Sequence, residues 1–140
     1  MLLCSFVVLL STIGIAQDLK IQKGTILDSL MVGDSLNQSF ALYLPRNFET
    51  KKQWPVVFAF DTKGKGKAAL VRLKLAAEKY GYLLAASNNI FDTISLSENM
   101  LTTKRMMDRV NALFPIDRNR VYTAGYKNSG RFANLVPLFI

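Results

Sequence analysis

Hydrophobic and polar positions alternate in the first part of the chain in the way that half-buried strands require. The segment FALYL at 40–44 places a large apolar residue at every second position, so these side chains share one face of an extended chain. We predict strands over 25–32 and 36–44 around a hairpin-type turn at 33–35. The unbroken apolar run VVFAF at 56–60 predicts a strand buried on both faces.

The second part of the chain switches between helical and strand-like patterns. Apolar residues recur there in two stripes of about 3.6-residue spacing, and the second stripe follows the S-x-x-E pair of Ser95 and Glu98, which is typical of a helix start. The expected elements are helices over 69–80 and 95–114 and buried strands over 82–87 and 121–124. This order predicts an α/β fold with three layers, in which an antiparallel hairpin is followed by a doubly wound parallel sheet.

Residues 1–16, MLLCSFVVLLSTIGIA, contain no charge and are almost wholly apolar. The segment is too short to span a bilayer comfortably and ends in a small-x-small pattern. We predict a secretory signal peptide cleaved before Gln17, with residues 17–140 as one domain. The protein is then secreted or periplasmic, without membrane association after cleavage. A buried N-terminal strand is the alternative.

Two features of the composition exclude several kinds of functional site. The sequence has no histidine, the usual general base and commonest metal ligand, and its single cysteine, Cys4, lies in the leader. We therefore expect no metal, no cofactor and no thiol nucleophile. Lysine and arginine outnumber aspartate and glutamate by 18 to 10. Because these basic residues are scattered without interleaved aromatic residues, we expect no nucleic-acid partner.

Three stretches, taken in order, carry a resemblance to a known family: FALYLPRNF with WPVVFAFD, then AAEKYGYLLAASNN, then NRVYTAGYKNSGRFANLV. They resemble the N-terminal half of α/β-hydrolases of the secreted esterase type, which include polyhydroxybutyrate depolymerases, feruloyl esterases and dienelactone-hydrolase-like proteins. The resemblance covers residues 25–138. It implies carboxylic ester hydrolysis by a serine, an acid and a histidine, with the serine at a sharp strand-to-helix turn.

The matching turn in this chain is GYKNS, residues 125–129, and its middle residue is Lys127 rather than a serine. The family requires small residues two positions before and after the nucleophile, because strand and helix approach closely there. Gly125 and Ser129 meet that requirement. The competing register makes Ser129 a shifted nucleophile, but it would place Lys127 and Arg131 in the crowded positions.

Lysine at this position does not favour ester turnover. Attack on an ester would leave an amide on Lys127, which is far harder to hydrolyse than the ester consumed. The resemblance places the acid and the histidine on later strands, and the sequence given stops at Ile140. We therefore expect a truncated or fragmentary relative that is not catalytically competent. Schiff-base chemistry at Lys127 is the remaining enzymatic option.

The resemblance also implies an oxyanion hole, formed by the amide of Asn128 and the loop that holds Thr62 and Lys63. Relatives commonly carry His-Gly in that loop, whereas this chain has Asp61-Thr62. Two helix N-termini should meet here and suit an anion such as carboxylate, sulfate or phosphate. The lysines that we expect to gather at this end of the sheet are Lys63, Lys65, Lys67 and Lys127.

Other functions remain open at this point. The segment GKGKAA at 64–69 fits the G-x-G-x-x-A pattern of dinucleotide sites, but Ser87-Asn88-Asn89 stands where the acidic partner is needed. The sequence favours an inactive esterase-like protein that meets a small ester or anionic ligand. The alternative is a non-catalytic module that binds an anion or a carbohydrate product at the lysine-lined loop end.

Overall fold

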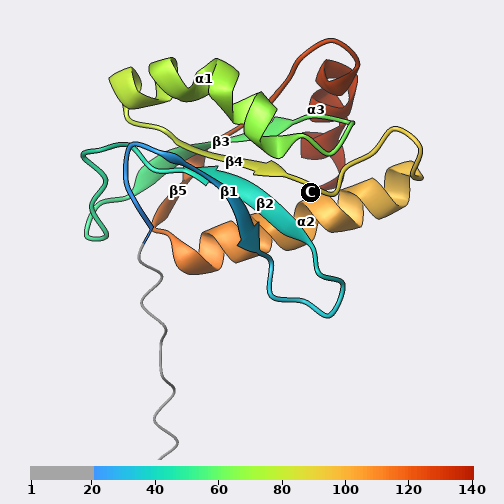
Figure 1. The fold of residues 1–140 in the computed structure, drawn as a ribbon, viewed down its shortest axis with the longest axis horizontal. Coiled ribbons are helices and arrows are strands. Elements are labelled where there is room, and N and C mark those ends of the chain that lie inside the picture. The colour runs from blue at the N-terminus through green and yellow to red at the C-terminus, as the bar shows by residue number, and fades with distance from the viewer. Residues whose placement is uncertain (1–20) are drawn as a thin grey trace, which may run out of the picture.

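The computed structural model describes residues 21–140, which form one mixed sheet with helices on both faces (Figure 1). The elements in chain order are β1 (Ile26–Met31), β2 (Ser39–Tyr43), β3 (Trp54–Phe60), α1 (Gly66–Tyr80), β4 (Leu83–Ser87), α2 (Leu96–Leu113), β5 (Ile116–Gly125) and α3 (Asn128–Phe139).

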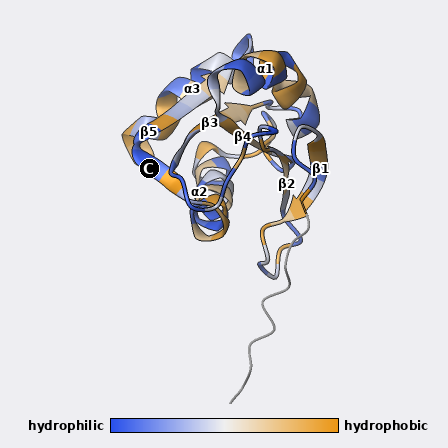
Figure 2. Ribbon diagram, turned by 90° about the vertical axis from the view of Figure 1, so that its left-hand side faces the viewer, coloured by the Kyte–Doolittle hydropathy of each residue, from blue (hydrophilic) through white to orange (hydrophobic). Residues whose placement is uncertain are grey.

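The five strands lie in the order β1-β2-β4-β3-β5. β2 pairs antiparallel with both β1 and β4, whereas β3 pairs parallel with β4 and β5. α1 and α2 lie on opposite sides of the strands (Figure 2). The predicted α/β class, with an antiparallel hairpin and a doubly wound parallel part, is confirmed.

Alternation along the central strand β3 explains the two-sided core. Val56, Phe58 and Phe60 belong to the larger apolar cluster, which α2 and α3 complete from one face of the sheet. Ala59, which points the other way, belongs to a smaller cluster with Leu70 of α1. β3 is therefore buried on both faces, as its unbroken apolar sequence predicts.

The predicted start of α2 and the predicted end of α1 are also found. Ser95 caps α2 by accepting the backbone N–H of Glu98, and its hydroxyl donates to the Glu98 carboxylate at 2.9 Å. Gly81 ends α1 in a left-handed conformation with φ of 73°. α1 begins at Gly66, three residues before the apolar stripe, because the first turn of a helix need not contribute to the core.

Two strand predictions need correction. β5 is not buried: it runs from Ile116 and forms one edge of the sheet among the described strands, with Val121 and Tyr122 exposed. An apolar run fixes the strand but not whether another element covers it. The second strand begins at Ser39 rather than residue 36, because Asn37 adopts a positive φ of 54° that interrupts an extended chain.

The signal peptide predicted over residues 1–16 and the domain start at Gln17 lie outside the described residues. Within 21–140, no helix combines the length and apolar character needed to cross a bilayer.

Candidate functional site

The turn between β5 and α3 is as sharp as the resemblance requires. β5 ends at Gly125 and α3 begins at Asn128, so only Tyr126 and Lys127 make the reversal. Lys127 has φ of 54° and ψ of −124°, a backbone region that residues with a side chain rarely adopt. Lys127 therefore forms the tip of the turn, which we call the elbow (residues 125–129), and its side chain is exposed.

The elbow brings the backbones of strand and helix into contact. A Cβ atom at Gly125 would overlap the carbonyl oxygen of Ser129, so the first position must be glycine. Ser129, the second residue of α3, is only 7% exposed. Its N–H donates back to the Tyr126 carbonyl at 3.2 Å. Ser129 thus lies inside the helix start, and its hydroxyl is not at the tip.

The Ser129 hydroxyl joins the elbow to the loop that follows β3. Its Oγ accepts the backbone N–H of Thr62 at 3.1 Å and lies 3.4 Å from Thr62 Oγ1. These two residues, far apart in the sequence, hold the two loops together at one end of the sheet.

The three predicted anion-binding residues have different surroundings. Asn128 begins α3, so its N–H has no partner within the helix and stays available. The N–H of Thr62 is occupied by Ser129, and the N–H of Lys63 donates to the Asp61 carboxylate at 2.8 Å. A hole made from Asn128 and Thr62 would first have to break the bond to Ser129.

A cavity of about 210 Å³ lies beside the elbow, between α1 and the ends of β3 and β5. Tyr126 borders it, and two cations lie over the Tyr126 ring: Arg72 Cζ is 4.4 Å and Lys127 Nζ is 5.4 Å from the ring centroid. Asp61 supplies a carboxylate at the same cavity. No local sequence pattern points to Arg72, because its contact with Tyr126 depends on which flank of α1 faces β5.

The expected gathering of lysines is wrong for Lys67. Its ammonium lies 3.5 Å from Asp28 of β1, and β1 and β5 are opposite edges of the sheet. Lys65 and Lys67 border a separate cavity together with Asp28 and Asn88. Lys65 and Lys67 therefore lie away from the elbow, where Lys127 is found.

The glycines of the dinucleotide-like segment have a structural reason. Gly64 has φ of 69°, and a Cβ there would overlap the Phe91 ring. A Cβ at Gly66 would lie 2.5 Å from the Ala86 carbonyl oxygen, because α1 begins against β4. Packing thus accounts for both glycines without a nucleotide.

Comparison with known proteins rests on structure. No protein-family model and no curated protein matches the chain. Acetyl xylan esterase from Aspergillus awamori is similar over 81% of this chain and 46% of its own, with a TM-score of 0.63 and 18% identity. Esterase 2 from Thermogutta terrifontis, phosphonylated by sarin, has a TM-score of 0.61 and 13% identity, and the match covers 77% of this chain and 43% of the esterase. Est1E from Butyrivibrio proteoclasticus has a TM-score of 0.59 and 14% identity, and the match covers 79% of this chain and 45% of Est1E.

These matches decide the architecture. The chain has an α/β-hydrolase-like fold. It spans less than half the length of the solved structures that it matches. In this α/β-hydrolase-like fold, the elbow at Lys127 is the turn to which the sequence resemblance assigns the nucleophile.

The residues described around the elbow include no histidine. A serine nucleophile requires a neighbouring base, and the sequence has no histidine. Among residues 21–140, no three histidine, cysteine, aspartate or glutamate side chains lie close enough to hold a metal ion.

Proposed function

We propose that this chain is a non-catalytic esterase-like protein, which keeps the elbow of the α/β-hydrolase fold without its nucleophile. The observation that carries the proposal is the strained backbone of Lys127, with φ of 54° and ψ of −124°. Such strain is usually found at functional sites. Here the tip presents an amine, and an ester that acylated it would form a stable amide rather than turn over.

Ser129 does not replace the missing nucleophile. Its hydroxyl is buried and occupied by Thr62, and no histidine exists to accept its proton. A serine hydroxyl without an adjacent base is a weak nucleophile. The small buried residue instead fits the role of closing the turn.

The experiment is hydrolysis of p-nitrophenyl acetate, followed by intact-mass measurement. We expect no turnover above the buffer rate and no preferential acetylation of Lys127. Labelling with a fluorophosphonate should leave every serine unmodified. Turnover that disappears in Ser129→Ala would establish a serine enzyme and contradict the proposal. Turnover that disappears in Lys127→Ala, with Lys51→Ala unchanged, would establish a lysine enzyme instead.

The second candidate is a module that binds an anion or a carbohydrate product. It is favoured by the two cations, Arg72 and Lys127, that lie over the Tyr126 ring beside the elbow cavity. One structural neighbour is named as an acetyl xylan esterase, which gives the carbohydrate option its support. The division of the loop lysines counts against a single lysine-lined site.

Calorimetry with phosphate, sulfate and galacturonate tests this second candidate. Saturable heats that vanish in the double variant Lys63→Ala/Lys127→Ala are expected if the module binds such ligands. Lys51→Ala/Lys52→Ala removes the same charge from a distant loop and serves as control. Heats that survive in the first variant, or no heats at all, would exclude this candidate.

We also propose that the protein is exported, on the basis of its uncharged apolar leader. Expression in a bacterial host should yield a protein outside the cytoplasm whose N-terminus is Gln17. A cytoplasmic product that keeps residues 1–16 would contradict export.

A further inference from the structure

A second cavity lies between α2, the β1–β2 loop and the β4–α2 loop. Its volume is about 410 Å³, and it shares no lining residue with the elbow cavity. Three of its walls are large apolar side chains that stay exposed, Leu36 (56%), Ile94 (38%) and Leu101 (53%). Exposed apolar side chains gathered around a hollow are typical of a binding site.

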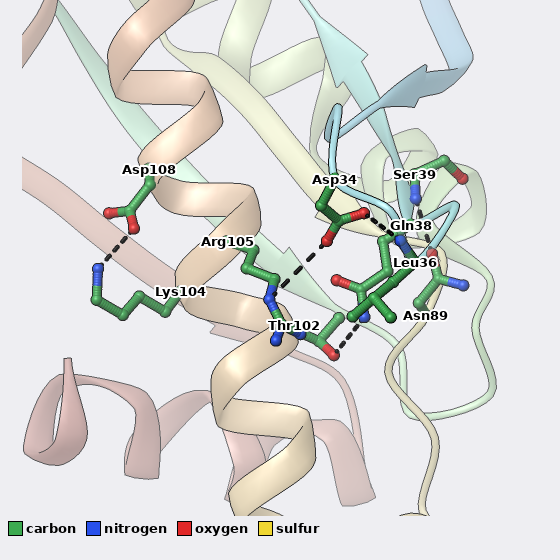
Figure 3. A network of polar contacts seen from close by, with 9 residues as sticks. All are labelled: Asp34, Leu36, Gln38, Ser39, Asn89, Thr102, Lys104, Arg105 and Asp108. Atoms are coloured by element: carbon green, nitrogen blue, oxygen red, sulfur yellow. Dashed lines mark hydrogen bonds and ion pairs between the residues drawn. The ribbon is translucent and has the colours of Figure 1, made fainter.

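The opposite side of this cavity is polar, and some of the polar groups near it lack a hydrogen-bond partner. Gln38 donates to Thr102 Oγ1 at 3.1 Å, and Arg105 of α2 lies beside this pair (Figure 3). Three buried side-chain polar atoms in residues 21–140 lack a hydrogen-bond partner: Asp34 Oδ2, Gln38 Oε1 and Arg109 Nε. All three belong to the contact between α2 and the chain that enters β2. Unpaired buried groups are rare in native proteins, so their grouping here needs an explanation.

The charges of this cluster leave positive charge in excess. Asp34 faces Arg105, but Oδ2 and Nε are 3.9 Å apart, too far for a hydrogen bond. The guanidinium of Arg109, one helical turn further, packs near Gly33 in the same loop. Arg105 and Arg109 thus both lie near this loop, whose only acidic residue is Asp34. Lys104 of the same helix adds nothing, because it pairs with Asp108 at 2.5 Å (Figure 3).

Glu98 is the one acidic residue among those that line this cavity, and it does not pair with Arg105. It is exposed and two turns before Arg105, about 10 Å along the helix axis. Among residues 21–140, no ion pair joins Glu98 to Arg105. Its carboxylate also accepts the Ser95 hydroxyl in the helix cap.

We propose that this cavity binds an amphiphilic carboxylate that carries an N–H or O–H next to its carboxyl group. The carboxylate would pair with Arg105, whose planar guanidinium suits it. The adjacent N–H or O–H would donate to the unpaired Gln38 Oε1, and an apolar side chain would lie against Leu36, Ile94 and Leu101. An N-acylated amino acid and the C-terminal residue of a peptide share this chemistry.

The probe is N-acetyl-leucine, titrated into the 15N-labelled protein and followed by NMR. We expect saturable shifts of amides in 36–38 and 91–105 at about millimolar concentration. Hexanoate lacks the N–H, and N-acetyl-leucinamide lacks the charge, so each should bind about tenfold more weakly. Absence of saturation, or equal binding of the acid and its amide, would overturn the proposal.

Matched variants test whether the ligand binds at this cavity. Arg105→Gln should weaken binding about tenfold, whereas Lys104→Gln removes the same charge from the adjacent residue and should not. Leu101→Ser removes an exposed wall and should also weaken binding, with Leu75→Ser on α1 as its control. If Arg105→Gln does not fold, the leucine pair decides the question. Equal affinities in Leu101→Ser and Leu75→Ser would contradict the site.

A third arm separates the two sources of the ligand. The peptide acetyl-Gly-Ser-Gly-Leu and N-acetyl-leucine carry the same carboxylate, N–H and side chain. Tighter binding of the peptide supports a protein C-terminus as ligand, and tighter binding of N-acetyl-leucine supports a free acid. Because no residue of the elbow takes part, this inference does not rest on the proposed function.

Discussion

Two strand-to-helix turns meet at the same end of the sheet, and they reverse the chain with different lengths and different residues at the positive φ. The turn from β3 to α1 uses five residues, 61–65, and places its positive φ on Gly64. The elbow uses two residues and places its positive φ on Lys127. Glycine adopts this conformation freely, whereas for lysine it costs of the order of 1–3 kcal/mol. The shorter turn therefore stores strain that the longer one avoids.

The two turns agree in their close backbone contacts. Gly66 lies against the Ala86 carbonyl, and Gly125 against that of Ser129, so neither position has room for a Cβ atom. The turns therefore differ in their length and in the residue that carries the positive φ, but not in these contacts. The backbone strain of the elbow is therefore present although its tip residue is a lysine.

The largest effect is expected from Gly125→Ala, which tests whether the elbow depends on close contact. The new Cβ would overlap the Ser129 carbonyl, so the turn would have to open. We expect the free energy of unfolding, measured in urea, to fall by about 3 kcal/mol.

Gly130→Ala is the matched control for Gly125→Ala. Its nearest atom, the Gly125 carbonyl oxygen, would be 3.3 Å from the new Cβ, and alanine favours a helix interior. Stability should therefore change by less than about 1 kcal/mol. Equal losses in the two variants would show that Gly125 has no special place in the turn.

The link between the two turns is tested by Ser129→Ala. The substitution removes the acceptor of the Thr62 N–H and leaves that donor unpaired in a partly buried place. We expect a loss of about 1–3 kcal/mol in the free energy of unfolding and faster hydrogen exchange at Thr62. Ser29→Ala, on the exposed side of β1, should stay within about 0.5 kcal/mol of the wild type. Unchanged exchange at Thr62 would exclude the link.

One source of acid sensitivity should be the other end of α1, away from both turns. The hydroxyl of Tyr43 donates to Glu78, and this bond holds the pKa of that carboxyl below its ordinary value of 4.5. A lowered pKa means that the folded state favours the ionised form, so stability is lost as the pH falls below about 4.5. Urea unfolding from about pH 7 to about pH 3 should therefore show a smaller acid loss in Glu78→Gln. Equal losses would contradict this assignment.

Local patterns predicted most of the fold because they act over short distances. The S-x-x-E pair fixed the start of α2, and the unbroken run in β3 required cover on both faces. The exposure of β5 could not be predicted, because it depends on what lies beside the strand and not on Val121 or Tyr122 themselves.

The candidate site likewise has one part that the sequence predicted and another part that it could not predict. The need for small residues at 125 and 129 pointed to Lys127 as the tip, where the structure places it. The Thr62–Ser129 bond, the Arg72–Tyr126 contact and the Lys67–Asp28 pair join segments far apart in the sequence. No pattern within one segment contains that information.

The most direct measurement compares the unfolding free energies of Lys127→Gly and Lys51→Gly. Lys127 carries a positive φ, whereas Lys51 is not among the residues with positive φ in 21–140 and lies in an exposed loop. If Lys127 forms a strained tip, Lys127→Gly should raise stability by about 1 kcal/mol, while Lys51→Gly lowers it by about 0.5 kcal/mol through chain entropy. A loss of stability in Lys127→Gly equal to that in Lys51→Gly would contradict the strained elbow.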